Sequence, residues 1–137
     1  MGIRHIGRKL AMQALYQAST RNDDVLDFMD YFIDSSDCDD SAKSWGKDLV
    51  SGAWKFHKDS DQLIGDYSIG WSLDRINLID LSILRLAFYE LSLKETPVNV
   101  ILDEAVELAK EFSTPESSKF INGILGKFVA DHVHGNH

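Results

Sequence analysis

Cysteine and proline are scarce in this sequence. Its 137 residues include one cysteine, Cys38, and two prolines, Pro97 and Pro115. A single cysteine has no partner for an intrachain disulfide, which favours a reducing, cytoplasmic setting. No apolar run approaches the roughly 18 residues of a membrane span, and the amino-terminal segment lacks the apolar core of a signal peptide. We therefore expect a cytoplasmic protein with no membrane association.

Signatures of catalysis and of cofactor binding are also missing. The sequence contains no G-x-S-x-G, no Walker loop, no H-E-x-x-H and no G-x-G-x-x-G. Cys38 stands among Asp37, Asp39 and Asp40, whose negative charges disfavour the thiolate that a nucleophile requires. The histidines at 132, 134 and 137 lie in a terminal segment, where metal binding would be adventitious. We expect no catalytic activity, no cofactor and no metal site.

Charge is unevenly distributed along the chain. The formal net charge is −8, yet residues 1–22 contain basic side chains and no acid. Residues 23–40 then contain eight aspartates and no lysine or arginine. A basic amino-terminus on an acidic body suits a protein that contacts a polyanion at one end and a basic protein partner elsewhere. The side chains of the basic segment are Arg4, His5, Arg8, Lys9 and Arg21.

Apolar residues recur with helical spacing, and strand-like alternation is absent. We expect an all-α protein of six or seven helices, folded as a single compact domain over residues 1–137. The ends, 1–5 and 132–137, are expected to be flexible. The first helix is predicted from about Ile6 to Ser19. Its basic face is expected to point away from the core and contains His5, Arg8, Lys9, Met12 and Tyr16.

The next segments also predict helices from their caps and apolar spacing. The second helix is expected to begin after Asn22 or Asp23, and the third after Ser41. The third pattern extends towards Tyr67, either as one long helix or as two in tandem with an interruption near Asp59.

The segment from Asn77 to Lys94 predicts the central helix of the bundle. It is apolar on most sides, and a helix of this kind is normally buried. Arg85 and Glu90 lie within it, and we expect both to pair with polar neighbours.

The segment from Pro97 to Lys127 predicts a helical hairpin. Thr114 is a favoured N-cap residue, and Pro115 suits the first helical position of the second helix. Phe120 lies beside the second apolar stripe, next to Lys119. The two stripes are Ile101, Ala105, Leu108 and Phe112 on the first helix, and Ile121, Ile124 and Phe128 on the second.

Two groups of side chains have the composition of a nucleic-acid surface. His5, Arg8 and Lys9 offer positive charge for phosphates, and Tyr16 offers a ring that can stack on a base. Phe120 beside lysines is typical of a platform for single-stranded nucleic acid. A phenylalanine at the edge of an apolar stripe is also commonly part of the core periphery, and spacing alone leaves both interpretations open.

Three parts of the sequence together resemble the NusB family of bacterial transcription antitermination factors. They read RKLAMQALYQ near the amino-terminus, LDRINLIDLSILRLAFYEL in the middle, and PVNVILDEAVELAKEF followed by SSKFINGIL. The resemblance covers about Arg4 to Ala130. It implies two packed helical bundles and a protein that binds boxA-type single-stranded RNA together with NusE, a ribosomal protein of the small subunit. The pair would load an antitermination complex onto RNA polymerase.

The resemblance also implies roles for individual residues. The surface for NusE corresponds to the middle of the chain, with Tyr67 and Asp80 as candidates. Under this interpretation the edge formed by Lys119 and Phe120 meets the basic first helix to complete one RNA surface. The positions that correspond to RNA contacts are Arg4, His5, Arg8, Lys9, Tyr16, Lys119, Phe120 and Asn122.

Two alternatives remain open at this point. The fold also resembles the amino-terminal RNA-binding domain of ribosomal-RNA cytosine methyltransferases, which would make the chain a module associated with RNA modification, although no methyl-donor domain follows in this sequence. Some NusB proteins form homodimers that cover the RNA face, so a structural homodimer is the other alternative.

Overall fold

The computed structural model describes residues 2–70 and 72–134, and this part of the chain is built of helices without a strand. Short 3-10 turns, Val25–Asp27 and Leu73–Arg75, and a π-helical turn, Ala130–His134, connect or extend the helices. The seven α-helices are α1 (Ile3–Arg21), α2 (Met29–Asp34), α3 (Asp40–Lys55), α4 (His57–Tyr67), α5 (Leu78–Leu93), α6 (Val98–Phe112) and α7 (Pro115–Val129). None of the described helices is long and apolar enough to cross a membrane.

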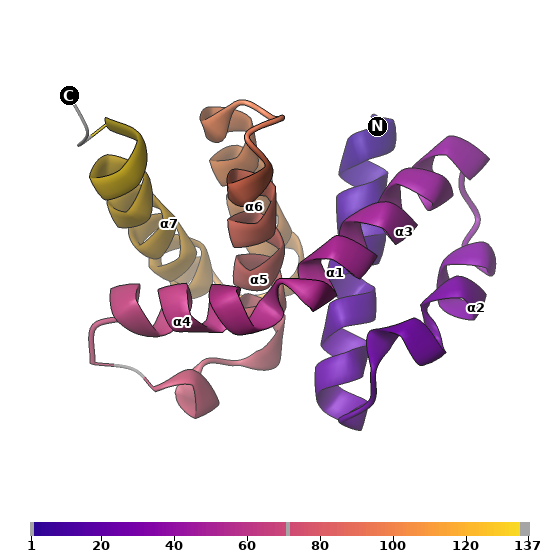
Figure 1. Cartoon of the computed structure of the whole chain (residues 1–137), viewed down its shortest axis with the longest axis horizontal. Helices are drawn as coiled ribbons and strands as arrows, with labels where there is room; N and C mark the ends of the chain where they lie inside the picture. Colours follow the sequence, from indigo (N-terminus) through magenta and orange to yellow (C-terminus); the bar gives the residue numbers. More distant parts are fainter. Residues whose placement is uncertain (1, 71, 135–137) are drawn as a thin grey trace.

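The helices form two groups that share α5. Figure 1 shows α1, α2 and α3 together on the amino-terminal side, and α4 to α7 together on the other side. Helix α5 packs against α1 and α3 of the first group and against α4, α6 and α7 of the second. The predicted all-α fold of two packed helical bundles is therefore confirmed.

Helices α1 and α3 cross closely because glycines lie at their contact. A Cβ atom built on Gly46 would lie 3.2 Å from the carbonyl oxygen of Gly7. A Cβ built on Gly7 would lie 2.5 Å from Cε3 of Trp45, so no larger residue fits there without a shift. Gly7, which weakens a helix by intrinsic propensity, is thus required by packing.

Helix α5 is the buried centre that its apolar pattern predicted. Arg85 and Glu90 of this helix have polar partners, as expected: Arg85 donates two hydrogen bonds of 2.8 Å to Asp61, and Glu90 pairs with Arg8. A third hydrogen bond joins Arg85 to Ser19 of α1 at 3.2 Å. The buried apolar side chains of α5 are Leu81, Ile83, Leu84, Leu86, Ala87, Phe88 and Leu91.

The terminal hairpin follows its sequence signals closely. The backbone N–H of Ser117 donates a 3.0 Å hydrogen bond to Oγ1 of Thr114, and Pro115 occupies the first turn of α7. The ring of Phe128 packs edge-on against Phe88, with ring centroids 5.0 Å apart. Most of the predicted stripe is buried, namely Ile101, Ala105, Leu108, Ile121 and Ile124.

Several predicted boundaries are wrong. Helix α1 begins at Ile3, three residues before the expected start. Asn22 adopts a left-handed conformation (φ 55°) and ends α1 instead of capping the next helix. The cap of the following 3-10 turn is Asp24, whose carboxylate accepts a 2.9 Å hydrogen bond from the N–H of Leu26. The tandem break falls at Phe56, earlier than Asp59.

Candidate nucleic-acid interface

Apart from Arg21 in its last turn, the basic residues of α1 lie in its amino-terminal half, and all four of them reach towards neighbouring helices. Arg4 is exposed, and its guanidinium lies 5.9 Å from the ring centroid of Trp45. Nδ1 of His5 lies 2.7 Å from Oε2 of Glu104, and Nζ of Lys9 lies 2.9 Å from Oε1 of Glu111. Both carboxylates belong to α6, so α6 neutralises much of the charge on this face.

Arg8 does not face solvent. Its side chain is 3% exposed and donates hydrogen bonds of 2.8 and 2.9 Å to the two carboxylate oxygens of Glu90. Its guanidinium also lies 5.1 Å from the centroid of Trp45. The expectation that this face of the first helix points away from the core is wrong for Arg8 and for Met12, which is 2% exposed. The reason is that α1 packs against both α3 and α5, which buries a wider arc than one apolar stripe.

Lys9 and Tyr16 form the outward part of α1. They are seven residues apart, so they lie on one face of the helix. Tyr16 is half-buried, and the side chain of Lys9 is 38% exposed. Nζ of Lys9 also lies 5.4 Å from the ring centroid of Phe112 at the end of α6, a cation–π contact. The face of α1 that contains Lys9 and Tyr16 therefore lies next to the end of α6, just before the turn into α7.

The predicted residues of α7 lie on two sides of that helix. Lys119 and Asn122 are exposed and line a hollow against α6, which supplies Asp103, Glu107 and Lys110. Phe120 is half-buried and lines a different pocket, on the side of the turn before α5. The structure therefore does not place Lys119 and Phe120 in one patch.

The hairpin reaches the first helix through α6. Figure 1 shows α6 between α1 and α7, and the ion pairs of His5 and Lys9 end on α6. The prediction that the Lys119–Phe120 edge contacts α1 directly is wrong, because α6 lies between α1 and α7. The basic residues of α1 and the exposed residues of α7 thus flank α6.

Phe120 shares its pocket with Asp80. This pocket has a volume of about 230 Å³ and is also lined by Arg75, Asn77 and Glu116. Asp80 is 4% exposed; its Oδ2 accepts a 3.1 Å hydrogen bond from Asn77, while its Oδ1 has no hydrogen-bond partner among the described residues. A residue predicted for RNA and one predicted for the protein partner are therefore neighbours.

Tyr67, the other candidate for the protein partner, lies near the opposite end of α7. Its hydroxyl donates a 2.9 Å hydrogen bond to Oδ2 of Asp131, and its ring packs edge-on against Phe128 at 5.8 Å. Phe128 follows Phe120 by eight residues, or about 12 Å along a helix. Burial is the main cause that raises the pKa of Tyr67, and the hydrogen bond to Asp131 adds to it. Tyr67 and Asp80 thus belong to different regions of the surface.

Sequence reasoning missed the acidic partners of α1. Glu104 and Glu111 are seven residues apart on α6, so they lie on one helix face, and that spacing is the signal that could have indicated them. Glu90 was expected to pair with a polar neighbour, but its partner Arg8 could not be identified from the sequence, because the two residues are 82 positions apart. Trp45 of α3, which contacts both Arg4 and Arg8, was also missed.

The sequence matches the model of the NusB family over residues 5–130. The chain belongs to the NusB family. Its similarity to curated family members extends over nearly the full length of this chain and of each relative. The transcription antitermination protein NusB of Elusimicrobium minutum is 40% identical over 98% of this chain and 99% of its own. That of Streptomyces avermitilis is 44% identical over 93% of this chain and 91% of its own.

Solved NusB structures have the same fold. NusB of T. maritima superposes with a TM-score of 0.84 and 34% sequence identity, covering 96% of this chain and 93% of its own. The structure of the antitermination factors NusB and NusE in complex with dsRNA includes a chain with a TM-score of 0.87 and 24% identity, covering 96% and 99%. The second likeness establishes the fold alone.

Proposed function

We propose that this protein is a transcription antitermination factor that binds boxA-type RNA together with NusE and helps to load an antitermination complex onto RNA polymerase. The observation that carries the proposal is the similarity, at about 40% identity and over nearly the whole chain, to proteins named for transcription antitermination. The proposed function includes no catalytic step and no cofactor, and its site of action is the cytoplasm.

The proposed RNA surface runs across α1, α6 and α7. Arg4 and Lys9 supply positive charge for phosphates, and Tyr16 supplies a ring on the same helix face as Lys9. His5 has Glu104 as its partner, so it contributes charge only when it is protonated and released. Arg8 is buried in its pair with Glu90, and its proposed role is to hold α1 in place.

On α7, the proposed RNA contacts are Lys119, Phe120 and Asn122. Lys119 and Asn122 are exposed beside α6, where a backbone phosphate and a base edge can reach them. Phe120 lines a pocket large enough for part of a base, and an aromatic wall suits stacking on any base.

The proposed NusE surface includes Asp80 and Tyr67. Support comes from the buried Oδ1 of Asp80, which has no hydrogen-bond partner in the part of the chain that the structure describes. A buried acceptor of this kind is stabilised by a donor that a partner supplies. The choice of NusE as the partner rests on the similarity to proteins named NusB, and a solved complex contains a NusB chain of this fold together with NusE and RNA.

Replacing Phe120 with alanine tests the stacking proposal. If Phe120 stacks on a base, RNA binding weakens by about 1–3 kcal/mol, measured by fluorescence anisotropy with a labelled boxA-type RNA. Phe32→Ala is the matched control, since Phe32 is also half-buried but lies in α2. Unchanged RNA affinity in a folded Phe120→Ala variant would assign Phe120 to the core periphery.

The partner proposal is tested by measuring RNA affinity with and without NusE at one salt concentration. We expect NusE to increase the affinity for boxA-type RNA more than the affinity for an RNA of scrambled sequence. Equal affinity for both RNAs, with no effect of NusE, would contradict the proposed function.

A further inference from the structure

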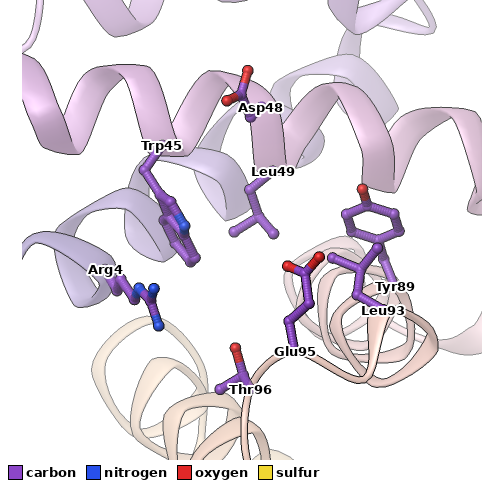
Figure 2. A pocket seen from close by; sticks show the side chains of 8 residues that line it. All are labelled: Arg4, Trp45, Asp48, Leu49, Tyr89, Leu93, Glu95 and Thr96. Carbon is purple, nitrogen blue, oxygen red and sulfur yellow. The ribbon is translucent and has the colours of Figure 1, made fainter.

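A pocket of about 280 Å³ opens between the first turn of α1, the middle of α3 and the connection from α5 to α6. Figure 2 shows its lining, with Trp45 on one side, Tyr89 and Leu93 on the other, and Glu95 between them. None of these four residues belongs to the proposed RNA or NusE surfaces. Arg4 lies at one edge of the pocket and Asp48 at another.

Both aromatic side chains of the pocket are seated against a glycine. The indole of Trp45 occupies the space where Gly7 of α1 lacks a Cβ, and the ring of Tyr89 occupies the corresponding space at Gly52 of α3. Any side chain at either glycine would overlap the ring beside it. The two aromatic walls are therefore held in fixed positions by backbone contacts, so a ligand between them meets a rigid, preorganised site.

The pocket contains negative charge that the described part of the protein does not neutralise. Asp48 comes from α3, and Glu95 follows Lys94, whose left-handed conformation (φ 56°) ends α5. Neither carboxylate has a basic side chain within ion-pair distance among the described residues. The pKa of Tyr89 is raised, first by burial and then by the charges of Glu95 and Asp48, which agrees with a negative potential here.

The aromatic side of the pocket already accepts guanidinium groups. Arg4 and Arg8 lie 5.9 and 5.1 Å from the Trp45 centroid. Arg4 is exposed and forms no ion pair with Asp48 or Glu95. The pocket thus combines aromatic rings, two leucine side chains and two carboxylates that have no ion-pair partner among the described residues. This is the chemistry that recognises an arginine side chain.

We propose that this pocket binds an arginine side chain presented by a basic segment of a protein partner. The guanidinium would pair with Glu95 in the space between Trp45 and Tyr89, with its alkyl stem against Leu93. Asp48, at the rim of the pocket, would add attraction at longer range. The formal net charge of −8 favours approach of a basic segment to this body. This site is separate from the surface assigned above to NusE, which involves Asp80 and Tyr67.

The probe for the test is N-acetyl-arginine-N-methylamide, and its neutral counterpart is N-acetyl-citrulline-N-methylamide. Binding is followed by the shift of the Trp45 indole N–H resonance, assigned with a Trp45→Phe variant. We expect a saturable shift with the arginine probe only. In the Asp48→Asn/Glu95→Gln variant the affinity should fall by at least about threefold. The matched control, Asp59→Asn/Glu107→Gln, removes the same charges from exposed positions outside the pocket.

Arg4→Ala separates this site from RNA binding. Removing the cation at the edge of the pocket should strengthen binding of the arginine probe, whereas it should weaken binding of boxA-type RNA. The inference is overturned by no saturable shift in the wild-type protein, by an equal shift with the citrulline probe, or by an equal loss in the two double variants. None of these outcomes depends on whether the protein binds RNA.

Discussion

Glu111→Gln should strengthen RNA binding, because the carboxylate of Glu111 competes with RNA phosphates for Lys9. The two side chains are 2.9 Å apart and 38% and 41% exposed. An exposed ion pair contributes about 0.2–1 kcal/mol, so releasing Lys9 should raise the affinity for RNA by about 1.4- to 5-fold. Glutamine keeps the shape of the side chain and a polar end, so the packing of α6 is retained.

The assay is fluorescence anisotropy with a labelled boxA-type RNA at one salt concentration, since salt alone changes the affinity strongly. Glu107→Gln is the matched control: it removes the same charge from the same helix, at a glutamate that pairs with Lys110 at 3.7 Å. Introducing Lys9→Met should abolish the gain that Glu111→Gln produces and leave any effect of Glu107→Gln in place.

Two results would refute this reasoning. If both glutamine variants bind RNA more tightly by the same factor, the gain comes from the overall charge of α6 and not from Lys9. If Glu111→Gln binds RNA as the wild-type protein does, the ion pair does not limit access to Lys9.

Three further predictions concern stability, each measured by urea unfolding. Glu90→Gln should lower the free energy of unfolding by about 3 kcal/mol, because it removes the hydrogen-bonded countercharge of buried Arg8 and leaves only Glu104, at 4.0 Å. Arg8→Met/Glu90→Leu should recover most of the loss, and a loss under about 1 kcal/mol in Glu90→Gln would contradict this prediction. Gly7→Ala should lower the free energy of unfolding by about 1–3 kcal/mol, because the added methyl group overlaps Trp45. Gly65→Ala, on α4, should raise it by about 0.5–1 kcal/mol, because nothing lies within 4 Å of the added methyl group. Similar effects of the two substitutions would refute the packing argument. Folding raises the pKa of Tyr67 above its usual 10.0, so the free energy of unfolding should fall as the pH rises above 10.0. Tyr67→Phe should make this fall less steep. An unchanged dependence of the free energy of unfolding on pH would exclude Tyr67 as its cause.

The elements that sequence reasoning placed correctly depend on local chemistry. Thr114 and Pro115 define the start of α7 within one turn of helix, and Asn77 caps α5 through the N–H of Asp80 at 2.8 Å. The central position of α5 followed from its own apolar surface. Such signals are readable because each cap and stripe is complete within a few residues.

The parts that sequence reasoning could not supply depend on distant partners. A helical wheel gives the direction of Arg8 relative to its own helix, but not the width of the arc that α3 and α5 bury together. Its partner Glu90 is 82 positions away. In the same way, Phe120 and Asp80 share a pocket only because the turn before α5 packs beside α7. The spacing of residues along one helix contains no information on contacts between residues that are distant in the sequence.

The pair of Arg8 and Glu90 also determines how the protein unfolds. It ties the first helix of one bundle to the helix that forms the centre of the other, and α5 supplies core side chains to both. Neither bundle keeps a complete core when α5 leaves it, so a fragment that contains only one bundle exposes apolar surface and an unpaired charge. The two bundles should therefore melt in one cooperative transition, in which loss of the amino-terminal helix and loss of the terminal hairpin are the same event.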